Sequence, residues 1–121
     1  MGAPSFQEVR DTVAELIKDR ILVGHGLVND FRALKLRHPL KLVRDTAKFE
    51  PLLNGNRPRK LQWLAQKVLN LEIQTSSHDP EQDARVSMLI YKALKKDWEK
   101  RISEKKFPKK QPKKKPLHTD T

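Results

Sequence analysis

Three segments decide how this chain folds: RILVGHGLVNDF at 20–31, RDT at 44–46 and HDPEQDAR at 78–85. In each of them an acid follows an apolar run or lies in the first turn of an expected helix. Asp30 comes soon after the apolar run Ile21–Val23, and Asp83 comes five residues after His78. A short, wholly apolar run is typical of a strand that is buried on both faces. The segments therefore predict strands that lead into helices, with acids and a histidine at the junctions.

Capping residues and apolar spacing predict an alternating order of helices and strands. Ser5 and Glu8 have the spacing of a capping box, Asn29 can cap a helix after the first strand, and Asp79 with Pro80 forms another helix start. The expected elements are helices at 6–19, 30–36, 61–69 and from 80 to the tail, strands at 21–23 and 41–44, and a loop at 50–58. This order predicts an α/β domain with about two parallel strands and flanking helices.

The expected sheet is small. Two short apolar strands bury too little surface to be stable alone. We therefore expect further strands, supplied either by a preceding segment of the chain or by a partner chain.

The last expected helix carries an apolar stripe on one face. Steps of three and four predict one buried face, made of Ala84, Met88, Tyr91, Leu94, Trp98 and Ile102. Trp63 and Trp98 lie on or near the stripes of their helices. We expect both indoles to pack inside the protein.

Composition separates a folded part, residues 1–103, from a lysine-rich tail, residues 104–121. Residues 101–121 hold eight Lys and Arg against two acids, and the whole chain carries +11. The tail lysines are Lys105, Lys106, Lys109, Lys110, Lys113, Lys114 and Lys115. A segment with so few apolar residues cannot offset its ordering entropy, so we expect it to be disordered. Lysine clusters bind nucleic-acid phosphates and serve as nuclear addresses; the alternative is a solubilising tail.

Other function classes are excluded by what the sequence lacks. The chain has no cysteine, so it has neither disulfides nor a thiolate metal site. Its longest apolar runs are far too short to span a membrane.

The combination of GHGLVNDFRAL, RDT, a leucine-striped helix and H-x4-D at a helix start resembles the RNA exonuclease 4 branch of the DEDDh 3′–5′ exonucleases. The likeness covers about Phe6 to Glu99. It implies a ribonuclease H-like fold and removal of nucleotides from an RNA 3′ end, in the nucleus or nucleolus during rRNA processing. RNA is the implied partner, with single-stranded DNA as a further substrate.

The resemblance also implies roles for three residues. Asp30 and Asp83 match acidic motifs that bind two Mg²⁺ or Mn²⁺ ions, and His78 matches the general base. These ions prefer carboxylate ligands, and a histidine that titrates near neutrality can accept the proton of water. Residues 1–20 contain no match to the family's first motif, D-x-E, so we expect an N-terminally truncated exonuclease domain that is inactive alone.

Each of these residues also has a structural interpretation. Asp83 can complement a helix dipole, Asp30 can be a helix-start acid beside Asn29, and His78 can be an ordinary loop residue. His25, between two glycines, is interpreted as a structural hydrogen-bonding residue.

Three hypotheses follow for the function. The first is a partial 3′–5′ RNA exonuclease whose activity belongs to a longer protein. The second is a truncated, catalytically silent paralogue that binds nucleic acid. The third is a basic adaptor without enzymatic activity, in which the motif match is coincidental.

Overall fold

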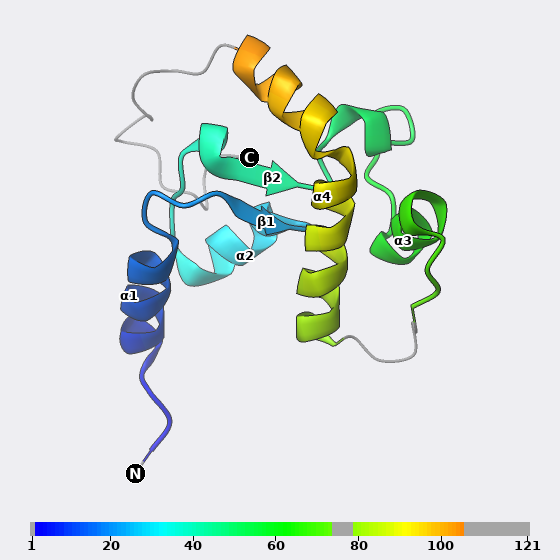
Figure 1. Ribbon diagram of the computed structural model, residues 1–121. Coiled ribbons are helices and arrows are strands. Elements are labelled where there is room, and N and C mark those ends of the chain that lie inside the picture. Colours follow the sequence, from blue (N-terminus) through cyan, green and yellow to red (C-terminus); the bar gives the residue numbers. More distant parts are fainter. Residues whose placement is uncertain (1, 74–78, 106–121) are drawn as a thin grey trace. The chain divides into compact units, whose positions relative to one another are not determined.

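The computed structural model describes residues 2–73 and 79–105 (Figure 1). The described residues divide into two compact units. The first unit contains residues 2–22 and 27–43, and the second contains residues 23–26, 44–73 and 79–105. None of the described helices is both long and apolar enough to cross a membrane.

Helix α1, Phe6–Ile17, begins as its capping sequence predicts. The Ser5 hydroxyl accepts a hydrogen bond from the backbone N–H of Glu8 at 3.1 Å. The helix ends two residues before the expected position, because Lys18 leaves the helical conformation with ψ 127° and Asp19 follows with φ 60°. No residue of α1 is buried within the described part of the chain.

Strands β1, Leu22–Gly24, and β2, Val43–Asp45, form a two-stranded parallel sheet. Both begin later than expected, by one residue for β1 and by two for β2. The delay of β2 has a local cause, because a 3-10 turn at Leu40–Leu42 follows Pro39 and occupies the start of the expected strand.

Helix α2, Leu27–Leu34, starts three residues before the predicted position. Asn29 therefore lies inside the first turn, and the prediction that it caps the helix is wrong. The chain turns sharply at Gly26. Its φ of 80° lies in the left-handed region, which favours glycine. This turn lets the helix begin directly after the strand.

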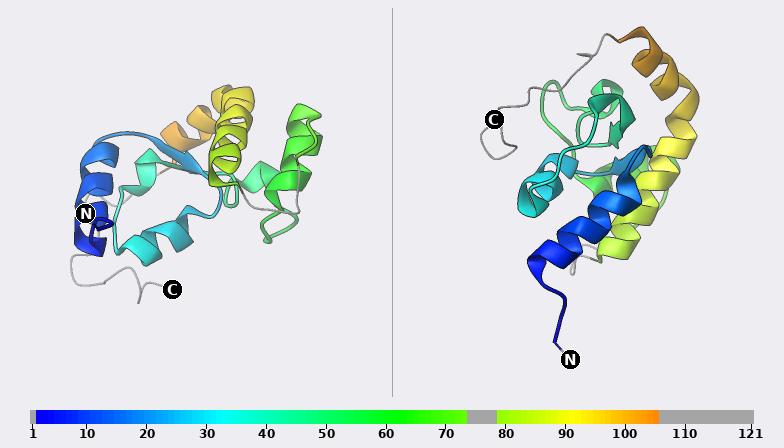
Figure 2. Two further views of the ribbon diagram at one scale, coloured as in Figure 1. Left: turned by 90° about the horizontal axis from the view of Figure 1, so that it is seen from below. Right: turned by 90° about the vertical axis from the view of Figure 1, so that its left-hand side faces the viewer.

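The second unit contains helices α3, Leu61–Leu69, and α4, Pro80–Glu104, which is the longest helix of the described residues (Figure 2). As predicted, Asp79 caps α4: its carboxylate accepts a hydrogen bond from the Glu81 N–H at 3.0 Å. The expected loop at 50–58 contains a 3-10 turn, Glu50–Leu52.

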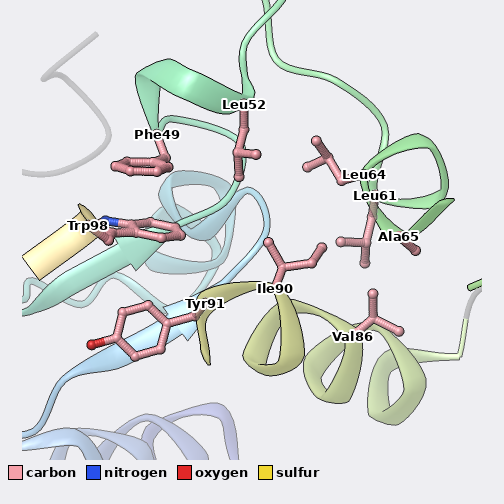
Figure 3. Packing of buried hydrophobic residues seen from close by; sticks show 9 residues of the cluster. All are labelled: Phe49, Leu52, Leu61, Leu64, Ala65, Val86, Ile90, Tyr91 and Trp98. Atoms are coloured by element: carbon pink, nitrogen blue, oxygen red, sulfur yellow. The ribbon is translucent and has the colours of Figure 1, made fainter. Parts of the chain in front are cut away.

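The core of the second unit lies between α3, α4 and the segment after β2 (Figure 3). Its buried residues are Phe49, Leu52, Leu61, Leu64, Ala65, Val86, Ile90, Tyr91 and Trp98. Trp98 packs as predicted: its ring stacks on Phe49 with centroids 4.0 Å apart and meets the edge of Tyr91 at 5.4 Å. The predicted face of α4 is partly wrong, because Ala84 and Met88 are exposed while Val86 and Ile90 are buried. The core uses the row of α4 that faces α3.

Candidate active site

Asp45, at the end of β2, anchors the turn that follows β1. Its Oδ1 accepts hydrogen bonds from the backbone N–H of Gly26 at 2.8 Å and of Ala47 at 2.9 Å. The residue is only 5% exposed, its bond to Ala47 is buried and its bond to Gly26 is partly buried. Asp45 therefore holds the Gly24–Gly26 turn in place. The sequence carried a signal for this role, since this acid directly follows the expected strand at 41–44, but its partner lies 19 residues away.

His25, at the centre of that turn, is held by Thr46. The His25 Nδ1 lies 2.7 Å from the Thr46 Oγ1, and the Thr46 hydroxyl is 3.2 Å from the carbonyl oxygen of Gly24, to which it can donate. Thr46 is fully buried, and its backbone N–H donates to the same carbonyl at 2.9 Å. This geometry agrees with the interpretation of His25 as a structural hydrogen-bonding residue.

Burial lowers the pKa of the His25 imidazole below its ordinary value of 6.5. The negative charges of Asp45 and Asp83, and a hydrogen bond with the Arg59 backbone, act in the opposite direction and raise that pKa. The Asp83 carboxylate is therefore close enough for its charge to influence the pKa of the His25 imidazole. The second unit thus brings together the Gly24–Gly26 turn, the end of β2 and the start of α4.

Asp83 lies in the first turn of α4 and is half-buried. Its backbone N–H donates to the Asp79 carbonyl at 2.9 Å, so the helix is already regular at this position. A negative charge is favoured here by the helix dipole. The carboxylate is thereby held near the His25 turn by a well-formed helix start.

The remaining predicted site residues lie elsewhere. Asp30 is exposed in the first turn of α2 and belongs to the first unit, whereas Asp83 belongs to the second. His78 lies outside the described residues. The same holds for the tail lysines except Lys105, which is exposed directly after α4. The tail lysines outside the described part are Lys106, Lys109, Lys110, Lys113, Lys114 and Lys115.

The predicted metal site includes Asp30 and Asp83. Within residues 2–73 and 79–105, no three His, Asp or Glu side chains gather as a group that could hold a metal ion. The described residues alone therefore do not form a site for two divalent ions, and no catalytic step through a metal follows from them.

Trp63, on α3, departs from the sequence prediction. Its side chain is not packed in the core: the residue is 40% exposed, and the guanidinium carbon of Arg59 lies 3.8 Å from the centroid of its ring. The Lys67 Nζ lies 5.7 Å from the same ring. The spacing of apolar residues did not predict this grouping, because α3 buries Leu61, Leu64 and Ala65 and leaves the adjacent Trp63 on its exposed side.

Comparison with known proteins identifies the class of protein to which the chain belongs. Residues 2–91 match the sequence family described as Exonuclease. The chain belongs to this family.

Particular relatives narrow the resemblance. RNA exonuclease 4 of Cryptococcus neoformans var. neoformans serotype D is 43% identical over 104 residues, which are 84% of this chain and 26% of that protein. RNA exonuclease 4 of Mus musculus is 41% identical over 106 residues, which are 85% of this chain and 24% of that protein. The chain thus spans about a quarter of the length of these relatives. The predicted resemblance to RNA exonuclease 4 is confirmed.

Solved structures agree on the fold. The Saccharomyces cerevisiae Pan2 pseudoubiquitin hydrolase–RNA exonuclease module, in complex with AAGGA RNA, matches with a TM-score of 0.67 and 33% identity, over 84% of this chain and 18% of that one. The Neurospora crassa Pan2 catalytic unit matches with a TM-score of 0.67 at 24% identity, over 86% of this chain and 18% of that one. The predicted α/β, ribonuclease H-like class is therefore confirmed.

Proposed function

We propose that this chain is part of a 3′–5′ RNA exonuclease to which it contributes Asp30 and Asp83 as ligands of Mg²⁺ or Mn²⁺ and His78 as general base. The observation that carries the proposal is the position of Asp83. Its charge reaches His25, in the turn that Asp45 anchors, within a chain whose residues 2–91 match the exonuclease family. The role of His78 rests on the H-x4-D spacing alone.

Exonucleases of this family generally depend on divalent metal ions. In such nucleases the metal ions activate the attacking water and stabilise the leaving oxyanion. Because the described residues do not form a complete metal site, we propose that further carboxylates and strands come from another segment, of this chain or of a partner chain. That segment would extend the sheet beyond β1 and β2.

We also propose that the substrate is RNA, with single-stranded DNA as a weaker one, and that the setting is nuclear or nucleolar rRNA processing. Support comes from the names of the relatives, from an RNA complex of a Pan2 module, and from the lysine-rich residues 105–115. Lysines neutralise phosphates regardless of sequence, and lysine clusters act as nuclear addresses.

The test compares residues 1–121 alone with the same residues fused behind a segment that carries the first motif expected of the family, D-x-E. Each protein is incubated with 5′-labelled single-stranded RNA and Mg²⁺ or Mn²⁺. We expect the fusion to yield a ladder of shortened products that keep the label, and residues 1–121 alone to yield few. A phosphate on the RNA 3′ end should slow the reaction if degradation starts there.

Matched variants assign the roles. Asp83→Asn and Asp30→Asn in the fusion should abolish degradation. Asp97→Asn, which changes a solvent-exposed acid farther along α4, should leave it unchanged. A folded fusion that binds RNA without degrading it would favour the second function, a catalytically silent nucleic-acid-binding paralogue. Full activity of the Asp83→Asn fusion would contradict the proposed ligand role.

A further inference from the structure

Helix α3 exposes one aromatic ring. Its core-facing residues Leu61, Leu64 and Ala65 are at most 9% exposed, whereas Trp63 is 40% exposed. An indole left in water on an otherwise well-packed helix forgoes the burial that usually stabilises it. The exposed ring therefore offers a flat apolar surface to a ligand.

Two cations flank this ring. Arg59 lies over its face, with the guanidinium carbon 3.8 Å from the centroid, and the Lys67 Nζ lies 5.7 Å away. Contact with the indole restricts the guanidinium before any ligand binds, so less entropy is lost when its N–H groups meet a phosphate. Neither cation forms a salt bridge within the described residues.

The surrounding segment is purely basic. Residues 51–71 contain Arg57, Arg59, Lys60 and Lys67 and neither Asp nor Glu. No ion pair within the described part of the chain neutralises any of the four. An uncompensated positive segment of this kind attracts a polyanion.

The position of Arg59 links this segment to the candidate active site. Its backbone forms a hydrogen bond that acts on His25, and His25 also feels the charge of Asp83. All of these residues belong to the second unit. Arg59 therefore borders the His25 turn, and Trp63 follows four residues later, in the first turn of α3.

We propose that Arg59, Trp63 and Lys67 form a binding surface for single-stranded RNA, the indole stacking on a base while the two cations contact the adjoining phosphates. This inference rests on the proposed exonuclease function, because it takes the RNA to be the strand that enters the Asp83 site. A single strand fits better than a duplex, since only unpaired bases present a free face to an aromatic ring. An acidic protein partner would pair with the cations but has no need of a flat, exposed indole.

The experiment measures the affinity of the full chain for a fluorescein-labelled single-stranded RNA of about ten nucleotides, by anisotropy in EDTA so that no cleavage occurs. Trp63→Ala should weaken binding by about fivefold or more, because removal of one base–aromatic stack has an effect of that order. Trp63→Phe keeps an aromatic face and should restore most of the affinity. RNA should also quench tryptophan fluorescence in the wild type but much less in Trp63→Phe, which retains only the buried Trp98.

Charge variants separate a local contact from general attraction. Arg59→Gln and Lys67→Gln should each weaken binding and lower the salt dependence. Lys92→Gln, which removes the same charge from an exposed position on α4, should change neither to the same extent. A duplex RNA of the same length should be bound equally well by wild type and Trp63→Ala.

The outcomes show separately whether the RNA-binding surface or the exonuclease proposal is wrong. If the wild type binds the RNA and Trp63→Ala binds it equally well, the surface is wrong while the exonuclease proposal stands. If Trp63→Ala loses affinity but the fusion is inert, the surface stands and the exonuclease proposal fails. If the wild type does not bind single-stranded RNA at all, the surface is wrong, and the fusion assay alone decides the exonuclease proposal. Circular dichroism of each variant checks that the fold is kept, and the difference in quenching between wild type and Trp63→Phe tests the contact at the indole itself.

Discussion

Arg44, in the middle of β2, donates two hydrogen bonds to the carboxylate of Glu99 on α4. Its Nε lies 2.7 Å from Oε2, and its Nη2 lies 3.0 Å from Oε1. The Tyr91 hydroxyl donates a third bond to Oε2 at 2.6 Å. The Arg44 side chain is 3% exposed and that of Glu99 is 33% exposed. This paired charge fixes the end of β2, and hence Asp45, against α4.

Removal of either partner should destabilise the second unit. We expect Arg44→Ala and Glu99→Ala each to lower the free energy of unfolding by about 1–3 kcal/mol, because the charged group left behind loses its hydrogen bonds. The double variant should cost less than the sum of the two. Urea denaturation of the four proteins measures this coupling, and strict additivity would show that the pair contributes nothing.

The same pair has a pH signature. The hydrogen bond from Arg44 lowers the pKa of Glu99, although partial burial opposes the shift. The folded state thus favours the ionised carboxylate, and the resulting stabilisation is present above the unfolded-state pKa, about 4.3, and is lost as the pH falls through the folded-state value. The difference in stability between wild type and Glu99→Gln should therefore shrink with acidification below that pH.

His25 should titrate below its ordinary pKa, because burial disfavours the imidazolium. The unfolded chain then takes up the proton more readily, so the contribution of His25 to stability falls as the pH drops below 6.5. Asp83→Asn should lower the pKa of His25 further, since the Asp83 charge raises it. NMR titration, with the signal assigned from a His25→Gln variant, measures both effects. An unchanged His25 pKa in Asp83→Asn, compared with Asp97→Asn, would refute the proximity of Asp83.

Asp45 should stabilise the fold through the hydrogen bonds that its side-chain oxygen accepts. Asp45→Ala leaves the partly buried N–H group of Gly26 and the buried N–H group of Ala47 without this partner, and we expect a loss of about 1–3 kcal/mol of stability. Asp45→Asn retains a carbonyl oxygen at the same place and should recover much of the loss. Thermal unfolding of the two variants makes the comparison, and equal losses would point to the charge of Asp45 rather than to its hydrogen bonds.

Residues 1–121 alone should associate or pack loosely. The sheet has two strands, α1 buries no side chain among the described residues, and Ile21 remains 46% exposed. Exposed apolar side chains beside a sheet edge favour self-association. Analytical ultracentrifugation and a thermal scan test this expectation. A monodisperse monomer with a sharp, cooperative transition would count against it.

Deletion of residues 106–121 should weaken RNA binding several-fold at low salt and flatten the plot of log affinity against log salt, because six lysines are removed. It should also reduce nuclear accumulation of a fluorescent fusion too large to diffuse through pores. If both properties are unchanged, these residues serve only solubility.

Local chemistry made several features predictable from the sequence. Ser5 and Asp79 start their helices because each side chain reaches an N–H only two or three residues away. Such contacts form whatever the rest of the chain does, so residue order alone determines them. The family was likewise readable from short motifs, because GHGLVNDFRAL, RDT and H-x4-D lie within residues 2–91, which match the exonuclease family.

Contacts between distant segments decided the rest. Asp45 could not be recognised as the anchor of Gly26 until two strands brought residues 19 positions apart together. The choice of Val86 and Ile90 rather than Ala84 and Met88 as the core face of α4 depended on where α3 packs, and that same packing left Trp63 exposed beside Arg59. Periodicity shows that a helix has an apolar face. Which row of that face is buried depends on the surface it meets, and only the tertiary structure supplies that surface.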